Sequence, residues 1–209
     1  MVEKDTVRRG YNEVADAFAD RRSVDAHERA VVEQFFDRLP PEAVILDAGC
    51  GQGTPILSTV TERYPASSPI GLDIAGAQLD LAADHVPEAV FIQGDLTRLP
   101  LASSSIDGAV AFHSLIHLPA DQHPHAIEEF ARVLRPGGRL LLSEGAKRWE
   151  GRNPDWLGTG VEMQWHIAGA PTTKRQIRDA GLTIESETTV SDILAEGEEW
   201  VFFEAVFRK

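Results

Sequence analysis

Short apolar runs that end in glycine or aspartate recur along the middle of this 209-residue chain. Such runs lack the polar–apolar alternation of half-exposed strands, so they predict strands that are buried on both faces. Apolar residues at helical spacing fill most of the intervals between them. Strands that alternate with helices predict an α/β fold with a parallel sheet covered on both faces. We expect strands near 44–49, 69–73, 89–94, 106–112 and 138–144, and helices near 53–64, 75–85 and 121–135.

The two ends of the chain differ from this regular middle. Residues from Val7 to about Leu39 show helical spacing, and Pro40-Pro41 ends the second helix. Residues 146–171 hold three tryptophans and several glycines without clear periodicity, so we expect a long connection there. The remaining expected elements are a helix near 172–180 that ends at Gly181 and strands near 182–190 and 199–208, separated by the acidic turn Glu196-Gly197-Glu198-Glu199.

The chain is strongly acidic, with 33 Asp and Glu against 20 Lys and Arg and a net charge of −13. Such a charge repels the phosphates of nucleic acids, so we expect no DNA partner. Only four of the basic residues are lysines, and an acid excess with few lysines resembles proteins of salt-adapted cells. Under that hypothesis the negative charge is an adaptation to a high-salt habitat, and it is weaker evidence against a nucleic-acid partner. An ordinary acidic surface is the alternative.

Cysteine usage and hydropathy bear on the compartment. The single cysteine, Cys50, cannot form an internal disulfide, which fits a reducing compartment. No charged-then-apolar leader opens the sequence, and no apolar run approaches the roughly 18 residues of a membrane span. We therefore expect a cytoplasmic protein with no membrane partner, and we leave its oligomeric state open.

The strongest candidate site lies where the first predicted strand ends, in residues 44–53, Val-Ile-Leu-Asp-Ala-Gly-Cys-Gly-Gln-Gly. Its alternating glycines permit positive φ and let a ligand approach the backbone closely. A helix expected just after them directs unpaired N–H groups at whatever occupies the turn. The segment therefore predicts a nucleotide-type cofactor site. A dinucleotide fingerprint would need a third glycine at position 54, which is Thr54.

Four further segments accompany this turn, over residues 69–74, 90–96, 106–118 and 131–142. Together the five segments resemble class I S-adenosylmethionine-dependent methyltransferases, and within them the small-molecule group called methyltransferase type 11. The resemblance implies a Rossmann-like three-layer sandwich with a seven-stranded, mostly parallel sheet and a final antiparallel strand. It also implies one domain over 1–209, made of a helical cap (1–40), a cofactor-binding core (41–145), a substrate-side connection (146–171) and a helix with a C-terminal hairpin (172–209).

The resemblance implies S-adenosylmethionine as cofactor and assigns residues to it. Asp73, at the end of the second strand, would accept hydrogen bonds from the ribose hydroxyls. Asp95 would accept from the adenine amino group, with the Leu96 amide at the ring. Read singly, each aspartate is also explained as a loop acid, Asp47 as a strand-end cap and Tyr11 as a helix aromatic packed on the sheet. The further expected contacts are Tyr11, Asp47, Gly49, Cys50, Gly51, Gln52, Gly53, Ile74, Gln78 and His113.

Three residues are candidates for catalysis at the acceptor, namely His113, His117 and Trp165. His113 ends the fourth predicted strand, where open α/β sheets place their chemistry, and either histidine is also explained as structural. Their i, i+4 spacing on one helical face would suit a metal, but the resemblance already accounts for this segment, and we predict no metal site. Trp165 belongs to a group expected to form a lid over the acceptor or to anchor the connection: Trp149, Trp156, Met163, Trp165 and His166.

We therefore expect an enzyme that transfers a methyl group from S-adenosylmethionine to a small-molecule acceptor by in-line displacement. RNA or protein methylation is the alternative, as is a non-catalytic protein that binds the cofactor. Enzymes that methylate base amino groups in DNA carry an Asn/Asp-Pro-Pro-aromatic element, which is absent where this chain reads Ala111-Phe112-His113-Ser114. Thr54 disfavours a nicotinamide oxidoreductase. The sequence leaves the acceptor and its reacting atom (O, N, S or C) open.

Overall fold

The computed structural model describes residues 2–21, 26–191 and 198–208. Helices and strands alternate through the middle of the chain, as the apolar runs predict. The helices are α1 (Lys4–Glu13), α2 (Ala15–Arg21), α3 (Ala26–Phe36), α4 (Ile56–Arg63), α5 (Gly76–His85), α6 (His123–Val133) and α7 (Ala170–Asp179), with the 3-10 turns η1 (Leu115–His117) and η2 (Ala120–Gln122). The strands are β1 (Val44–Ala48), β2 (Ser68–Asp73), β3 (Val90–Gln93), β4 (Ile106–Ala111), β5 (Leu134–Gly145), β6 (Trp149–Trp156), β7 (Val161–Ile167), β8 (Leu182–Ser191) and β9 (Glu199–Phe207).

Seven of the described strands form one sheet in the order β3-β2-β1-β4-β5-β9-β8. The first five in that order pair in parallel, while β9 runs antiparallel to both of its neighbours, β5 and β8. The expected Rossmann-like sheet with a late antiparallel strand is therefore confirmed. The strand order reverses between β1 and β4, and open α/β sheets bind ligands at the carboxyl ends of the strands beside such a switch point.

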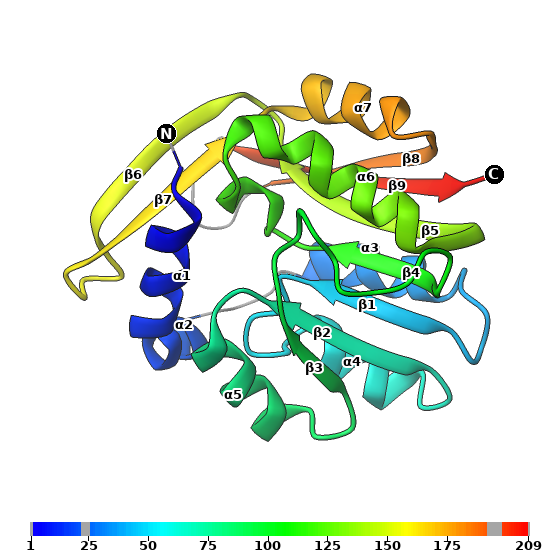
Figure 1. Ribbon diagram of the computed structural model, residues 1–209, viewed down its shortest axis with the longest axis horizontal. Helices are drawn as coiled ribbons and strands as arrows, with labels where there is room; N and C mark the ends of the chain where they lie inside the picture. The colour runs from blue at the N-terminus through cyan, green and yellow to red at the C-terminus, as the bar shows by residue number, and fades with distance from the viewer. Residues whose placement is uncertain (1, 22–25, 192–197, 209) are drawn as a thin grey trace.

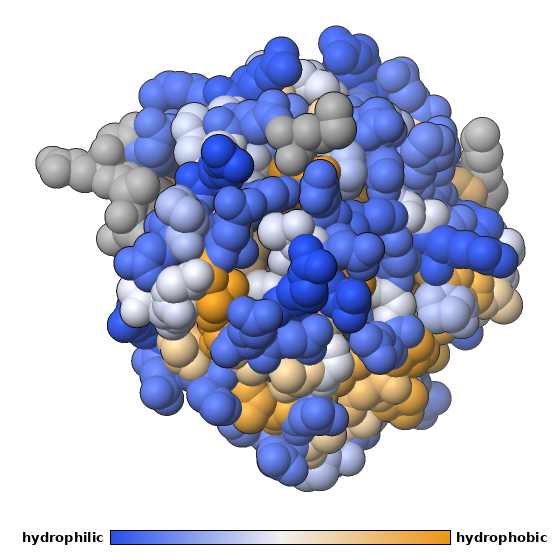
Figure 2. Space-filling view, turned by 60° about the vertical axis from the view of Figure 1, so that its left-hand side comes forward, coloured by the Kyte–Doolittle hydropathy of each residue, from blue (hydrophilic) through white to orange (hydrophobic). Residues whose placement is uncertain are grey.

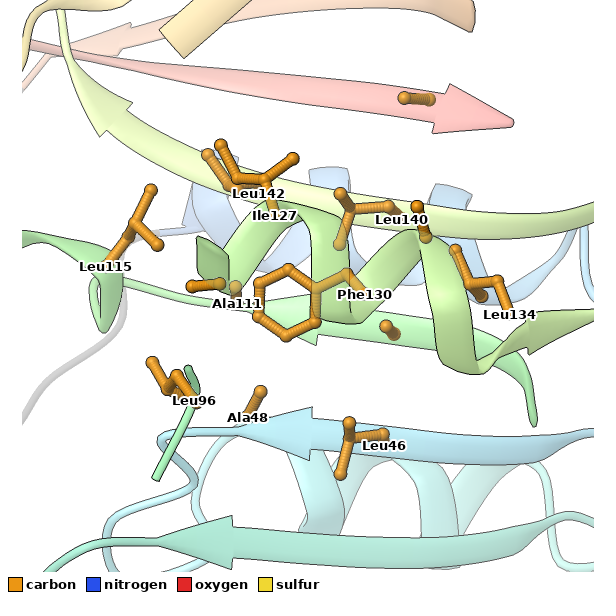
Figure 3. Close-up of a cluster of buried hydrophobic side chains, with 14 of the residues drawn as sticks. Leu46, Ala48, Leu96, Ala111, Leu115, Ile127, Phe130, Leu134, Leu140 and Leu142 are labelled. Atoms are coloured by element: carbon orange, nitrogen blue, oxygen red, sulfur yellow. The ribbon is translucent and has the colours of Figure 1, made fainter. Parts of the chain in front are cut away.

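Helices cover both faces of this sheet and bury its side chains (Figure 1). On one face, Ile127 and Phe130 of α6 pack with Leu140 and Leu142 of β5 in a buried cluster (Figure 3). On the other face, α3 and α4 contribute apolar side chains such as Phe36 to a second cluster. Burying one large apolar side chain contributes about 1.5–3 kcal/mol, so these clusters hold the strands on which the site is built.

The prediction that residues 146–171 form a long connection without regular structure is wrong, because this segment forms the antiparallel hairpin β6–β7. The sequence of β6 does not alternate between apolar and polar residues as a half-buried strand does, because β6 is exposed along most of its length and contains Gly151 and Pro154. The hairpin lies beside α1 in Figure 1, and Met163 of β7 is fully buried in a cluster with Val7 of α1. The segment is therefore an ordered cover that meets the N-terminal helices.

The helix expected from residue 53 begins later, at Ile56. Pro55 precedes it as the N-cap residue, and the Thr54–Pro55 peptide bond is cis. Proline suits a helix start because it has no N–H group left unsatisfied there. The glycine turn therefore continues to Pro55 before the helix begins.

Two features concern the rest of the chain. Gly181 follows α7 with a φ of +84°, as expected of a residue that ends a helix. Glu196 and Gly197 of the expected acidic turn lie outside the described residues, and β9 begins at Glu199. Within the described ranges, every helix is too short or too polar to cross a membrane. The face shown in Figure 2 is largely hydrophilic, with hydrophobic residues gathered in its lower part.

Candidate functional site

The glycine turn after β1 is held against the end of β2. The N–H groups of Gly49 and Cys50 both donate to the Leu72 carbonyl, at 2.7 and 3.0 Å. Gly49 has a φ of +85°, and a Cβ placed on it would lie 2.3 Å from the Cβ of Ser114, just after β4. Glycine alone meets both demands, so the turn brings the carboxyl ends of β1, β2 and β4 together.

Asp73, the last residue of β2, braces the same turn. Its Oδ2 accepts the Gly51 N–H and its Oδ1 accepts the Ala75 N–H, both at 2.9 Å. Burial raises the pKa of Asp73, and the hydrogen bonds from these amides oppose that rise. Each carboxylate oxygen keeps a further lone pair, so Asp73 can still accept hydrogen bonds from the hydroxyl groups of a ligand.

Asp95 lies just beyond β3, on the same side of the sheet. Its Oδ1 accepts from the N–H and the hydroxyl of Thr97, at 2.9 and 2.8 Å, and its Oδ2 accepts from Lys4 Nζ of α1 at 2.5 Å. Burial acts to raise the pKa of Asp95, but Lys4 and Thr97 outweigh it and the pKa lies below its ordinary value. The ionised carboxylate therefore ties the start of α1 to the end of β3.

His113 follows β4 in the left-handed region, with a φ of +53°, and its backbone N–H donates to Ser143 Oγ of β5 at 2.7 Å. Its imidazole Nε2 lies 2.9 Å from Glu28 Oε1 of α3. The imidazole also packs edge-on against the Trp200 ring, with 4.2 Å between centroids. Glu28 is only 8% exposed, so a carboxylate and an imidazole share one buried corner, the Glu28–His113 pair.

His117 lies in η1 and faces α1 and β7. Its Nδ1 is 3.0 Å from the Gln164 carbonyl oxygen, which can only accept, so Nδ1 carries the proton. The unprotonated Nε2 then accepts the hydroxyl proton of Tyr11 at 2.8 Å. Burial lowers the pKa of His117 to about 4, so the imidazole is neutral at physiological pH and has one fixed tautomer.

Aromatic rings from α1, α2 and the hairpin gather around Tyr11. Its ring meets Phe18 at 5.3 Å and Trp156 at 5.2 Å between centroids, both edge to face. Trp156 in turn lies 6.0 Å from Trp165 of β7. Such pairs contribute about 0.5–1.5 kcal/mol each beyond burial, so they hold the first two helices to the hairpin. We call these four residues the aromatic roof.

A cavity of about 320 Å³ lies under the aromatic roof and reaches the glycine turn. Its wall also contains both histidines, Glu28 and Trp200. A cavity of this volume falls in the range of pockets that enclose small-molecule ligands, about 300–1,000 Å³. Most of the residues that the sequence predicts for the site line it together: Tyr11, Asp47, Gly49, Cys50, Gly51, Gln52, Asp73, Ile74, Asp95, Leu96, His113, His117 and Trp165.

Two predicted site residues, Gly53 and Gln78, lie outside this lining. A Cβ on Gly53 would meet Val86 and Ala82 at 3.2 and 3.4 Å, so glycine at this position lets the end of helix α5 pack closely against the turn. The fully buried Gln78 donates from its side-chain amide to the Tyr11 carbonyl at 3.3 Å. Both residues therefore support the lining from behind.

The two histidines do not share a helical face, although their spacing allows it. The left-handed conformation of His113 and the 3-10 turn at His117 separate them, and each imidazole turns to different partners. In the part of the chain that the structure describes, no group of three or more His, Cys, Asp and Glu side chains is placed to hold a metal ion.

The residues expected to form a lid divide between the two alternatives. Trp156 and Trp165 line the cavity as part of the aromatic roof. Met163 and His166 are buried away from the cavity lining and anchor the hairpin, while Trp149 is 51% exposed. The segment therefore supplies both a wall of the cavity and its attachment to the body.

Sequence reasoning missed several residues of the lining, among them Lys4, Phe18, Glu28 and Trp200. The first three lie on the N-terminal helices and Trp200 lies on β9, all far along the chain from the glycine turn. Only Glu28 carried a local signal, because it precedes Val32 by four residues and so stands as an acid on the buried face of α3.

A family model described as a methyltransferase domain matches residues 45–138. The match begins in β1 and runs into β5, so it contains the glycine turn, Asp73, Asp95 and His113. It leaves out α1 to α3, the hairpin and the last two strands of the sheet. The shared region therefore supplies the glycine turn and both histidines of the cavity wall, while the N-terminal helices, the hairpin, β8 and β9 supply the rest of the wall.

Two curated relatives extend the similarity over most of the chain. The 27-O-demethylrifamycin SV methyltransferase of Amycolatopsis mediterranei is 28% identical over an alignment of 214 positions. The alignment covers 88% of this chain and 76% of the relative. The tRNA (carboxymethyluridine(34)-5-O)-methyltransferase of Arabidopsis thaliana is 29% identical over 187 residues, 85% of this chain and 43% of the relative. The chain spans 43%, 51% and 28% of the first three curated relatives that it matches, so much of each relative has no counterpart here.

A solved structure shows the same fold over almost the whole chain. The 1,6-didemethyltoxoflavin-N1-methyltransferase of Burkholderia thailandensis is 18% identical, with a TM-score of 0.74 over 98% of this chain and 88% of that one. It was solved with bound 1,6-didemethyltoxoflavin and S-adenosylhomocysteine. At this identity the likeness concerns the fold, and the chemistry has to be argued from the residues of the cavity.

Proposed function

We propose that this chain is a class I S-adenosylmethionine-dependent methyltransferase and that it transfers a methyl group from that cofactor to a small-molecule acceptor, because a model described as a methyltransferase domain matches residues 45–138. The observation that carries the proposal is the cavity that joins the glycine turn to the Glu28–His113 pair under the aromatic roof. One end offers glycines and two aspartates to a nucleoside, and the other offers an imidazole, a carboxylate and aromatic rings to a second molecule.

The residues at the glycine turn fit this cofactor. A Cβ on Gly51 would meet only the side-chain oxygen Oε1 of Gln78, at 3.5 Å, so the backbone there is open to a ligand. Among the described residues, the hydroxyl of Ser114 is buried without a hydrogen-bond partner, and Ser114 lines the cavity beside Gly49. An unsatisfied buried polar group costs about 1–3 kcal/mol, which a polar ligand in the turn would recover.

We assign the parts of the cofactor along the cavity wall. Asp73 would accept hydrogen bonds from the ribose hydroxyls, and the turn from Asp47 to Gln52 would hold the methionine part, next to the His113 backbone. Asp95 and Leu96 would meet the adenine, with Ile74 beside it. Lys4 already occupies Asp95 Oδ2, so in this chain the adenine amino group would share that carboxylate with a lysine.

S-adenosylmethionine supplies a sulfonium-bound methyl group that an acceptor atom attacks in line. The chain contributes by binding and orienting the acceptor under the aromatic roof, a proximity effect worth up to about 7–11 kcal/mol. His117 fixes the hydroxyl of Tyr11, and both residues line the cavity. His113 and Trp165 complete the wall beside the acceptor, and we assign His113, His117 and Trp165 to this part of the site.

A small-molecule acceptor is supported by the size of the cavity and by the name of the relative that acts on 27-O-demethylrifamycin SV. The relative named as a tRNA methyltransferase keeps RNA as the alternative acceptor. The net charge of −13 disfavours a phosphate-rich acceptor. The size of the cavity and the net charge therefore both favour a small-molecule acceptor.

Calorimetric titration with S-adenosylhomocysteine tests the cofactor assignment. We expect the native protein to bind it, Asp73→Ala and Asp95→Ala to bind it at least about tenfold more weakly, and Asp80→Ala to bind it normally. Asp80 is the control because it is exposed on α5. A native protein that fails to bind, at low and at high salt, contradicts the proposal.

A methyl-transfer assay with a radiolabelled donor then tests the acceptor class. Label transferred to a small molecule from an acceptor panel supports the proposal. Label transferred to tRNA and to no small molecule identifies the alternative.

A further inference from the structure

The end of the cavity farthest from Asp95 carries a buried negative charge that the proposed cofactor contacts leave unused. Glu28 lies in the cavity wall and is 8% exposed. Its Oε1 lies 2.9 Å from His113 Nε2, while its Oε2 makes no hydrogen bond with any residue that the structure describes. One oxygen of a buried carboxylate is therefore open to a donor from a ligand.

His113 holds that carboxylate in place from a rigid base. Ser143 Oγ of β5 accepts the His113 backbone N–H at 2.7 Å and lies 3.4 Å from His113 Nδ1. The hydroxyl proton of Ser143 is thus free to point at Nδ1, which leaves the Nε2 proton to be donated to Glu28. The imidazole therefore occupies Glu28 Oε1 and sets the direction of Oε2.

The described residues around the pair supply aromatic rings and no lysine or arginine. Trp200 and Phe112 pack on the His113 ring, with 4.2 and 4.4 Å between centroids, so aromatic rings flank the imidazole that holds Glu28. Among the described residues of the cavity lining, Lys4 is the sole lysine or arginine, and it is bound to Asp95. Asp95 follows β3 and His113 follows β4, three places apart in the sheet order, so Lys4 does not offset Glu28.

We propose that the Glu28–His113 pair is the acceptor subsite and that it selects an acceptor whose reacting end is a hydroxyl or an amine, while it rejects a carboxylate. This assignment rests on the proposed methyltransferase function. An O–H or N–H group of the acceptor would donate to Glu28 Oε2, whereas an anionic acceptor would be placed beside a buried like charge. The acceptor class is thereby narrowed to neutral or cationic molecules.

Three ligands of one shape and different charge test the selection: benzyl alcohol, benzylamine and benzoate. Their binding is measured by saturation-transfer NMR, with and without S-adenosylhomocysteine. We expect the alcohol and the amine to bind and benzoate to bind at least about tenfold more weakly, because a like charge beside a buried carboxylate is strongly unfavourable. In Glu28→Gln the disadvantage of benzoate should fall to within about threefold.

Glu33→Gln is the matched control. Glu33 lies on the same helix as Glu28 but pairs with Arg63 at the surface, so this variant should keep the native selectivity. Benzoate binding as tightly as the amine to the native protein contradicts the assignment, as does a Glu28→Gln variant that still discriminates. No binding of the alcohol or the amine at millimolar concentration contradicts it too.

Calorimetry with S-adenosylhomocysteine separates this assignment from the proposed function. The NMR measurement in the absence of S-adenosylhomocysteine tests the selectivity for the acceptor even if the protein does not bind that cofactor product. A Glu28→Gln variant that loses S-adenosylhomocysteine affinity and keeps native selectivity shows that Glu28 serves the cofactor, and it overturns the acceptor assignment. Unchanged affinity with lost selectivity supports it.

Discussion

At the scale of single residues, the shape of the cavity depends on Gly49, whose positive φ and close approach to Ser114 both require glycine. Gly49 has a φ of +85° and faces Ser114, whereas Gly137 has a φ of +82° and open space around it. Gly137→Ala therefore incurs only the backbone cost of about 1–2 kcal/mol. Gly49→Ala adds a clash with Ser114, typically about 1–3 kcal/mol more.

Urea unfolding of the two variants measures this difference. We expect Gly49→Ala to lower the free energy of unfolding by more than Gly137→Ala does, and to weaken S-adenosylhomocysteine binding as well. Equal losses of stability would mean that Ser114 moves aside at little cost.

The residues of the site that the sequence predicts are those with a local signature. Gly49 and Asp73 belong to turns directly after apolar strands, and parallel strands bring such turns to one edge of the sheet. Glu28 and Lys4 reach the cavity only because their helices pack across that edge. Their contacts depend on how the helices pack on the sheet, and the spacing of residues along the chain does not predict that packing.

The histidines illustrate the same limit within a few residues. His113 and His117 look equivalent by spacing, but one lies against the Glu28 carboxylate and the other is neutral between Tyr11 and a carbonyl group. The difference arises from a left-handed residue and a 3-10 turn, which a helical reading of 113–117 does not foresee.

At the scale of elements, the buried strands of the main sheet could be predicted and the hairpin could not. A parallel strand covered on both faces is apolar along most of its length, and β1 and β4 show that pattern with one aspartate each. β6 is exposed along most of its length and contains a proline, so nothing in its composition separates it from a loop. Hydrogen bonds to β7 and contacts with α1 supply what the local sequence lacks.

The hairpin should stabilise α1 through Met163. This side chain is fully buried, and Gly10 of α1 lies close enough that an added Cβ would be 2.9 Å from Met163 Cε. Met163→Ala should therefore cost about 2–5 kcal/mol and loosen α1 against the hairpin. Hydrogen exchange should show faster exchange in α1 with unchanged protection in β4.

Trp149→Ala is the control on the same hairpin, because Trp149 is 51% exposed. It should leave the protection of α1 close to native. Uniform loss of protection across the sheet in Met163→Ala would show that α1 and the core unfold as one unit.

At the scale of the whole molecule, stability depends on buried groups that titrate in opposite directions. Burial raises the pKa of Glu144 to about 7, although Thr173 and the Gly145 N–H donate to it. Unfolded, it would titrate near 4.5, so its ionisation lowers stability as the pH rises from about 4.5 to 7. Burial lowers the pKa of His117 and His123 to about 4, so both lower stability as the pH falls from about 6.5 to 4.

Glu144→Gln separates these contributions. The variant should be more stable than the native protein at pH 8, by about 1–3 kcal/mol, and the gain should shrink towards pH 5, where Glu144 is already protonated. Urea unfolding at both pH values measures the gain, with Glu128→Gln, an exposed site on α6, as the control. A gain that is the same at pH 5 and pH 8 would show that packing, and not charge, is responsible.

The Lys4–Asp95 ion pair bears on how the protein should be produced and immobilised. α1 begins at Lys4, and in Figure 1 the N-terminus lies beside the hairpin while the C-terminus lies at the far end of β9. Anything fused ahead of Lys4 leaves the molecule next to the cavity. Trp200, near the start of β9, lies in the cavity wall, and Phe207 lies at the other end of the strand, so a purification tag or surface linker after residue 208 leaves the binding site unobstructed.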